Sequence, residues 1–335
     1  MSHRGPSAHG TSIAHRTAMR CDIHVHSFYS GYVNQPVLRH LGRDSYSAPE
    51  DVYDAAKRRG MDLVTLSDHD SIEGAMRLAG RKDFFTSEEV TCVLESLPGE
   101  ADRVLHLGVL GISEKQHEGI AARRREPARL MSYLDEEGIA WCVNHLFSPL
   151  TGPRRLSDLD FALSRAHALE TQNGMMPAAT NQFAAEEAGK RGLATVGGSD
   201  AHAVASVARA YTVVDGANTV EEFLEGVRAG QARAEGLNGR VILLTRDVVT
   251  NFAKGYAHNF KNAHRSAADT LRALGLLAIS PLMPLLPLVI ALVHHKEVHG
   301  ALEMHADFMD ARQGGQEVAV PVYETDGSGG LPVVE

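Results

Sequence analysis

The chain is poor in cysteine and in aromatic residues. It contains three cysteines and one tryptophan among 335 residues, and aromatic residues make up only 6%. Cys21, Cys92 and Cys142 are unevenly spaced and include no C-x-x-C pair, which excludes a disulfide scaffold and a cysteine metal clamp. Each lies in or beside an expected strand, so we expect three small buried side chains in a reducing compartment.

Basic residues are also in the minority. The chain has 33 Lys and Arg against 42 Asp and Glu, for a net charge of -9. Binding to nucleic acid usually needs a clear cationic face, and Arg123-Arg124-Arg125 is only one short basic run, so the charge argues against a nucleic-acid partner. The first residues lack the apolar core of a signal peptide, which predicts a disordered leader over 1–19 and a cytoplasmic protein.

What the chain does contain is a series of short apolar runs that alternate with segments of helical spacing. The expected strands are Arg20–Val25, Asp62–Leu66, Val90–Leu94, Val104–Leu110, Ile139–Val143, Leu193–Val196 and Arg209–Val214. The expected helices are Pro49–Gly60, Ser71–Arg81, Pro127–Glu137, Leu156–His167, Asn181–Arg191 and Val220–Ala229. Strands this apolar are typical of parallel sheets covered on both faces, so the alternation predicts an α/β protein with a (β/α) barrel over 20–240.

Histidine and carboxylate residues follow most of these strands. In a (β/α) barrel the carboxyl ends of the strands point at one shared centre. His24 and His26 are two apart on an extended segment and therefore project to one face, and Asp200 and His202 repeat this spacing. Glu89 can bridge two ions through its two oxygens, an arrangement that activates water for phosphoryl displacement. The pattern predicts a multinuclear metal site and favours hydrolysis.

In this order the motifs resemble those of the polymerase and histidinol phosphatase (PHP) family of metallophosphoesterases, over roughly Cys21 to Gly239. They are Asp22-Ile-His24-Val-His26-Ser27, Leu66-Ser-Asp68-His69-Asp70, Ser87-Glu88-Glu89-Val90, His106-Leu-Gly108, Asn144-His145, Glu170-Thr-Gln-Asn173-Gly174 and Gly197-Gly-Ser-Asp200-Ala-His202. The resemblance implies a distorted (β/α)7 barrel with two or three divalent ions (manganese, iron or zinc). It also implies hydrolysis of a small phosphomonoester, such as a nucleotide or sugar phosphate, by metal-activated hydroxide.

The resemblance further implies a ligand for each ion. The first ion is held by His24, His26, Glu89 and Asp200, the second by His69 and His202, and the third by His106, His145 and the bridging Glu89. Relatives have a further ligand in a Ser-Asp-Gly turn after His26, where this chain reads Ser30-Gly31-Tyr32 and a stretch from 32 to 43 looks inserted. Asp44 is the candidate replacement and His40 the second choice. If neither reaches the site, the second ion is weakly held.

Two residues are candidates to protonate the departing alkoxide, namely His202 and Asp68. Asp68 has two alternative roles, orienting its neighbours or carrying the acid at a helix start. The candidate substrate contacts are Arg124, Arg154, Glu170 and Asn173. The alternative for the two arginines is a position in solvated loops. The alternative for Glu170 and Asn173 is hydrogen bonding within the barrel.

The C-terminal part departs from the barrel pattern. Residues 241–312 are expected to form a helical extension, followed by a disordered tail over 313–335. Its segment 274–293 is uncharged over twenty residues, which is long enough to cross a bilayer, but it contains Pro281, Pro284 and Pro287. The segment is either a membrane anchor or a contact within the chain or in a homodimer. The preceding basic stretch, residues 248–273, either lies on anionic lipid or packs on the barrel.

Two other functions remain open at this point. One is a non-catalytic, metal-binding regulatory module at a membrane, which loss of ligation at Asp44 would favour. The other is hydrolysis of a carbon–nitrogen bond, although no lysine follows a strand where a carboxylated bridging ligand would lie. The small phosphorylated substrate itself is not identified by the sequence.

Overall fold

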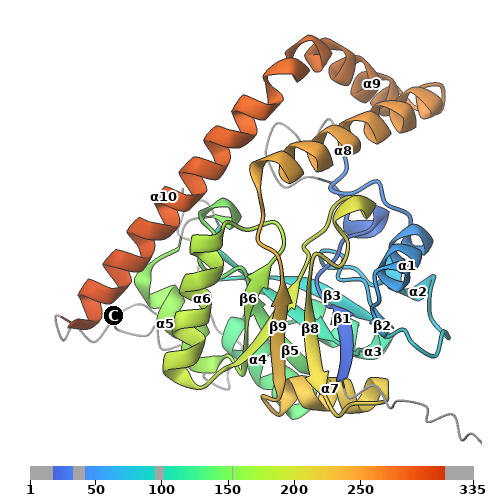
Figure 1. Cartoon of the computed structure of the whole chain (residues 1–335). Coiled ribbons are helices and arrows are strands. Elements are labelled where there is room, and N and C mark those ends of the chain that lie inside the picture. The colour runs from blue at the N-terminus through green and yellow to red at the C-terminus, as the bar shows by residue number, and fades with distance from the viewer. Residues whose placement is uncertain (1–17, 33–41, 95–101, 153, 314–335) are drawn as a thin grey trace, which may run out of the picture.

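The computed structural model describes residues 18–32, 42–94, 102–152 and 154–313 (Figure 1). The leader before residue 18, the tail after residue 313, His40 and most of the inserted stretch lie outside the described residues. Within the described part, strands and helices combine in the α/β class that the sequence predicts.

The described strands form two sheets. One has the order β2-β1-β8-β9, from β1 (Ala18–Asp22), β2 (Leu63–Val64), β8 (Ala210–Asp215) and β9 (Ala232–Gly236). The other has the order β3-β4-β5-β6-β7, from β3 (Ser87–Val93), β4 (Val104–Leu110), β5 (Ala140–Asn144), β6 (Ala168–Asn173) and β7 (Ala194–Gly198). Seven of these match the predicted strands in position, and β6 and β9 are additional.

The sheets are mixed rather than wholly parallel. β1 pairs in parallel with β2, and β5, β6 and β7 are parallel to one another, but β3-β4, β4-β5, β1-β8 and β8-β9 are antiparallel. The prediction of parallel strands is therefore wrong for β3-β4, β4-β5 and β1-β8, whereas β9 is not among the predicted strands. For β3 and β4 the reason is the short link over 94–103, which permits a hairpin but no crossover helix.

A closed barrel is likewise not confirmed. Among the described residues, the two sheets are connected by isolated bridges, Val25 to Ala201, Val64 to Phe84 and His69 to Glu89, rather than by continuous ladders. Two of these bridges involve or adjoin the predicted ligands. The seams between the sheets therefore run through the place where the sequence predicts the metal site.

Helices cover the sheets: α1 (Pro49–Arg58), α2 (Glu73–Met76), α3 (Glu114–Ala121), α4 (Pro127–Glu136), α5 (Leu156–Arg165), α6 (Ala178–Arg191) and α7 (Val220–Arg228). α1 begins as predicted, with Pro49 in its first turn and acidic residues beside it. The predicted helix 71–81 is reduced to the single turn of α2, and Gly80 has φ +88°. The three cysteines are buried and free, as expected.

Three further helices and one 3-10 turn lie above and beside the sheets (Figure 1). They are α8 (Val241–Asn262), α9 (Ala267–Ile279), a 3-10 turn η5 (Ser280–Leu285) and the long α10 (Leu286–Gln313). α8 is fixed to the barrel end because the buried Asp247 accepts a hydrogen bond from Ser206 Oγ. On α10, the buried Phe308 and the hydrogen bond from Ser148 Oγ to Glu297 Oε1, 3.0 Å, fix its second half.

The segment Ala267–Arg312 is the one described helix long and apolar enough to cross a membrane by length and composition. Its most apolar window has a mean hydropathy of 2.4, and only 6% of that window is buried. The apolar stretch 274–293 thus lies between α8 and the second half of α10, which are both fixed to the rest of the protein, and most of its own side chains are exposed.

Candidate metal centre

Nine predicted ligands converge at the seam between the two sheets. Their donor atoms form four overlapping groups, each within 4.8 Å: His26, Asp44, His69 and His202; His24, His145 and Asp200; His24, His26 and Glu89; and His69, Glu89 and His106. The members come from the segments after β1, β2, β5 and β7 and from β3 and β4 themselves. Residues more than 170 positions apart in the chain therefore meet in one cluster.

The close approach of β1 and β7 requires glycine. A Cβ on Gly198 would lie 2.2 Å from His24 Cβ and 2.8 Å from His24 N. Asp22, at the end of β1, accepts hydrogen bonds from Ser199 N at 2.8 Å and Ala208 N at 2.6 Å. The glycine and the aspartate together place His24 beside the loop that carries Asp200.

Glu89 lies at the middle of the cluster. Its Oε1 is 3.0 Å from His145 Nε2, and its Oε2 is 3.0 Å from His69 Nδ1. Burial alone would raise the pKa of this carboxyl, but His24, His106 and His69 hold the pKa well below its usual value. An ionised carboxylate with one oxygen toward each side fits the bridging role that the resemblance implies.

Asp44 reaches the cluster from beyond the inserted stretch. Its Oδ2 is 3.1 Å from His202 Nε2 and 3.9 Å from His69 Nε2. Burial would raise the pKa of Asp44, but these histidines hold the pKa well below its usual value. Burial would lower the pKa of His202, but Asp44 raises the pKa to about 10. Asp44 therefore lies beside His69 and His202, and its role as the replacement ligand stays a prediction.

Divalent ions fit these residues. Buried donor atoms of the cluster lack a hydrogen-bond partner within the described part of the chain, namely His24 Nε2, His26 Nε2, Asp44 Oδ2, His69 Nδ1, Glu89 Oε2, both nitrogens of His106 and His145 Nδ1. An unpartnered buried polar atom is costly, and such atoms are rare in folded proteins. Imidazole and carboxylate donors at this spacing match the ligands of zinc, manganese and iron.

Glu170 and Asn173 lie behind the ligands and not at a mouth. Glu170 Oε1 is 2.8 Å from His24 Nδ1, and Oε2 accepts from His145 N at 3.0 Å. Asn173 Nδ2 donates to Glu170 Oε2 at 2.9 Å and to Asp200 Oδ2 at 3.2 Å. Both side chains are buried because β6 directs them inward. These contacts agree with the alternative of hydrogen bonding among the barrel residues, here to His24 and Asp200, rather than with substrate contact.

The two candidate acids, Asp68 and His202, both form hydrogen bonds beside the cluster. Asp68 accepts from Ser27 N at 2.6 Å and from Ser27 Oγ at 2.7 Å, which uses both of its oxygens to hold the loop after β1. His202 Nδ1 lies 2.8 Å from the carbonyl oxygen of Asp200 and donates to it, so only Nε2 faces the cluster. A ring that binds an ion through Nε2 has no further proton to deliver. The geometry supports an orienting role for Asp68 and a ligand role for His202.

The two candidate arginines do not reach the site. Arg124 is partly exposed and pairs with Asp70 at 2.8 Å. Arg154 donates to Ser148 O at 2.8 Å and to Thr151 Oγ1 at 2.6 Å within its own turn. Neither lines the cavity beside the cluster. Sequence alone does not distinguish an arginine that contacts substrate from a solvated one, because a positive charge does not reveal where the side chain points.

A cavity of about 300 Å³ adjoins the cluster at Asp44 and His202. Its far wall comes from the C-terminal helices, through Val248 and Phe252 of α8 and Ile279 of α9. The surface that these residues present to the cavity is almost entirely carbon. Sequence reasoning missed this wall, because no local signal in 241–279 ties these helices to the motifs two hundred residues earlier.

Comparison with known proteins adds a family match. A family model described as PHP-associated matches residues 178–232, which include Asp200 and His202. An uncharacterised protein of Methanocaldococcus jannaschii is 25% identical over 145 residues, which are 42% of this chain and 77% of that protein.

Two solved structures are also similar. PsfC from Pseudomonas syringae is 20% identical, with a TM-score of 0.48 over 71% of this chain and 99% of PsfC. A two-domain protein from Bacteroides vulgatus, which contains a predicted PHP-like metal-dependent phosphoesterase, is 17% identical, with a TM-score of 0.46 over 70% of each chain.

Proposed function

We propose that this chain, whose residues 178–232 match a PHP-associated family model, is a metal-dependent phosphoester hydrolase of the PHP family whose substrate is a small phosphomonoester. The observation that carries the proposal is the convergence of nine histidine and carboxylate side chains, seven of which have a buried nitrogen or oxygen without a hydrogen-bond partner among the described residues. A purely structural polar cluster would satisfy these atoms internally.

The residues of the cluster and those behind it would have separate roles. The four groups of donors would hold the ions, with Glu89 between them. Divalent ions, when bound, activate water as a nucleophile and neutralise charge on phosphoryl oxygens. Glu170 fixes the His24 ring with Nε2 toward the cluster, and Asn173 restrains the carboxylate of Asp200. The chain thereby orients its ligands before the substrate arrives.

The exposure of the ligands indicates where the substrate enters. His69, Asp44 and His202 have side chains 22%, 13% and 24% exposed, whereas Glu89 is fully buried. A phosphoryl group would therefore approach past these three residues, from the cavity beside them. A cavity of this size suits a small molecule with a terminal phosphate and supports a phosphomonoester over a nucleic-acid strand.

The test uses the full chain loaded with Mn²⁺. We would measure phosphate release from p-nitrophenyl phosphate, nucleoside monophosphates and sugar phosphates, with bis(p-nitrophenyl) phosphate and single-stranded DNA as diesters. His24→Ala removes a buried ligand, and His299→Ala removes an exposed histidine on α10 as the matched control. The proposal predicts monoester turnover that H24A loses and H299A keeps. No turnover of any monoester, or preference for the diesters, would overturn it.

A further inference from the structure

The apolar cavity and the exposed C-terminal corner point to the leaving group and its source. We propose that the substrate is a phosphomonoester with a long apolar leaving group, taken from an anionic membrane into which the corner formed by residues 271–293 inserts. This inference rests on the proposed phosphomonoesterase function and names its substrate class.

The first observation is the chemistry of the cavity. It opens on Asp44 and His202, and its opposite wall is made of Phe252, Leu276 and Ile279. Polar residues such as Arg43 and Asn251 also line the cavity, but almost all of its surface is carbon, so most hydroxyl and amide groups of a nucleoside or sugar bound there would lack hydrogen-bond partners, which costs binding free energy. An alkyl chain would instead gain from each methylene that it buries. The cavity therefore suits an apolar group attached to the phosphate.

The second observation is that α9 has two apolar faces. Leu276 is buried against the cavity, whereas Leu274 and Leu277 on the same helix are 54% and 47% exposed. The first turns of α10 continue this surface with the exposed residues Leu288 and Leu292. Helix α9 thus contributes both to the wall of the cavity and to the exposed corner. An alkyl chain that leaves a lipid surface therefore has a short path to the ligands.

Lipid explains this exposure better than a second copy of the chain. From Leu285 to Val293 the exposed and half-exposed residues are all apolar and lie around the whole helix. A helix that is apolar on every side is matched by a bilayer, whereas a dimer contact covers one stripe. A partner chain would leave the remaining leucines in water.

The corner would enter one leaflet rather than cross the bilayer. α9 packs on α8, and the second half of α10 is fixed by the buried Ala301 and Phe308. Because both ends are held on the same side of the apolar stretch, its tip is the bend at η5 (Figure 1). The prolines in this bend have no backbone N–H group, so they leave no such donor unpaired in lipid. The hydroxyl of Ser280 is also paired, because its Oγ donates to Leu276 O at 2.9 Å.

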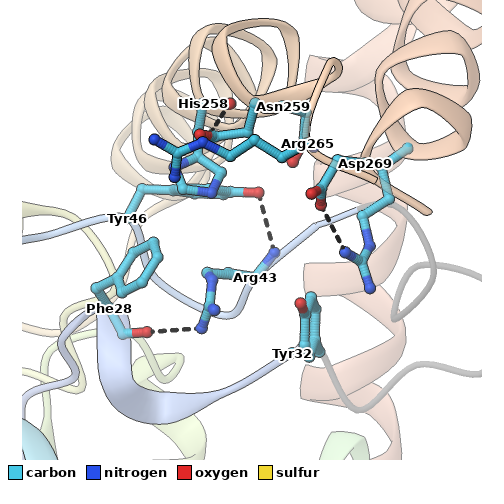
Figure 2. Close-up of a pocket in the computed structure, with 10 residues that line it drawn as sticks. Phe28, Tyr32, Arg43, Tyr46, His258, Asn259, Arg265 and Asp269 are labelled. Atoms are coloured by element: carbon cyan, nitrogen blue, oxygen red, sulfur yellow. Dashed lines mark hydrogen bonds and ion pairs between the residues drawn. The ribbon is translucent and has the colours of Figure 1, made fainter. Parts of the chain in front are cut away.

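A cationic pocket lies at the base of the corner. Its lining residues come from the stretches 28–32 and 42–46 and from the helices α8 and α9 with the turn between them (Figure 2), and its volume is about 240 Å³. Its lining contains Arg43, Arg265, Arg272 and His258, and Asp269 is the one acid among its lining residues. Asp269 pairs with Arg272 at 3.0 Å, which leaves an excess of positive charge. This charge complements the anionic headgroups of the leaflet that the corner would enter.

The first experiment uses a series of alkyl phosphates from butyl to octyl, below their micellar concentrations, with the Mn²⁺-loaded full chain. Each buried methylene should raise kcat/KM roughly fourfold, so octyl phosphate should exceed butyl phosphate by on the order of 100-fold. Glucose 6-phosphate and AMP should be poorer than either. Turnover of all these monoesters without a dependence on chain length would overturn the inference while leaving the proposed function intact. No turnover of any monoester would overturn both.

A binding measurement separates the cavity from catalysis. Calorimetry of 1-octanol binding to the metal-free protein should give an affinity at least tenfold lower for Ile279→Asn, whose side chain lines the cavity. Leu277→Asn on the exposed face of the same helix is the matched control and should bind as the parent does. Equal binding by both variants, or none by the parent, would contradict the assignment of the cavity.

Sedimentation with vesicles tests the membrane contact. The protein should sediment with phosphatidylserine-containing vesicles and less with pure phosphatidylcholine, and the triple variant L274Q/L277Q/L288Q should lose sedimentation. Leu237→Gln changes a leucine equally exposed elsewhere and should have no effect. A parent protein that stays in solution with both vesicles, or that forms a dimer broken by the triple variant without binding vesicles, would refute the membrane source.

Discussion

Replacing Glu170 with glutamine tests whether the side chains behind the ligands control the metal site. In the parent, His24 Nδ1 donates to Glu170 Oε1 at 2.8 Å, and Glu170 Oε2 accepts from His145 N and from Asn173 Nδ2. Glutamine has one acceptor oxygen and one amide group that donates. The new amide must therefore face at least one N–H donor, and the charge-assisted bond to His24 is lost.

The expected cost follows from the role of such partners. Loss of a carboxylate that orients a ligating histidine lowers metal affinity by about 10- to 100-fold, or about 1.4 to 2.7 kcal/mol. We would measure Mn²⁺ affinity by competition with a chromogenic chelator, and folding by circular dichroism. The E170Q protein should remain folded, because the substitution is isosteric and removes no apolar contact.

Glu88→Gln is the matched control. Glu88 is also buried and also pairs with a histidine, His117, at 2.9 Å, but it lies on the opposite face of β3 from Glu89 and in none of the donor groups. The Mn²⁺ affinity of E88Q should therefore be within about twofold of that of the parent, because loss of an orienting hydrogen bond lowers metal affinity only when the oriented residue is a ligand. Equal losses in E88Q and E170Q, or none in either, would refute the reasoning.

Three further predictions concern the packing, the inserted stretch and the pH dependence of stability. Gly198→Ala places a Cβ 2.2 Å from His24 Cβ and should destabilise the protein by about 1 to 3 kcal/mol. As the control, the new Cβ of Gly189→Ala in α6 meets nothing within 4 Å, and this variant should be more stable than the parent by about 0.5 to 1 kcal/mol. Urea unfolding measures both free energies. Asp44→Asn should reduce the bound metal measured by mass spectrometry, while the exposed Asp54→Asn on α1 should not; equal metal content would show that Asp44 is no ligand. The hydrogen bond to Glu88 raises the pKa of His117, so this pair stabilises the fold fully below the unfolded pKa near 6.5 and loses its effect as pH rises through the folded pKa. His117→Gln should therefore lower the melting temperature at pH 6, by the equivalent of about 1 kcal/mol, and by less at pH 9; an equal loss at both values would contradict the assignment.

The members of the histidine and carboxylate cluster were predictable from the sequence because most are tied to a local signal. His24 and His26 lie at the end of one apolar run, and Glu89 lies directly before another, so each stands out by its position beside a strand. These residues converge in the structure although the predicted strand direction is wrong for β3-β4, β4-β5 and β1-β8. The position of Asp44 was also recoverable, because the acid-to-proline spacing resumes after the inserted stretch.

The surroundings of the site were not predictable in the same way. Whether Glu170 faces the substrate or the back of His24 depends on which side of β6 borders the cluster, and the segment around it has no alternation that reveals this. The cavity wall depends on the docking of α8 through Asp247 and Ser206, a contact between residues 41 positions apart with no sequence signature. Long-range packing, rather than local propensity, determines both features.

The central claim is that the clustered histidines and carboxylates hold the ions that make this chain a phosphomonoesterase. We would strip the full chain with a chelator, return Mn²⁺ in steps, and record phosphate release from p-nitrophenyl phosphate against bound metal. The account predicts no turnover without metal and full recovery at two or three ions per chain. Turnover that persists after chelation, or its absence at full metal occupancy, would contradict the account.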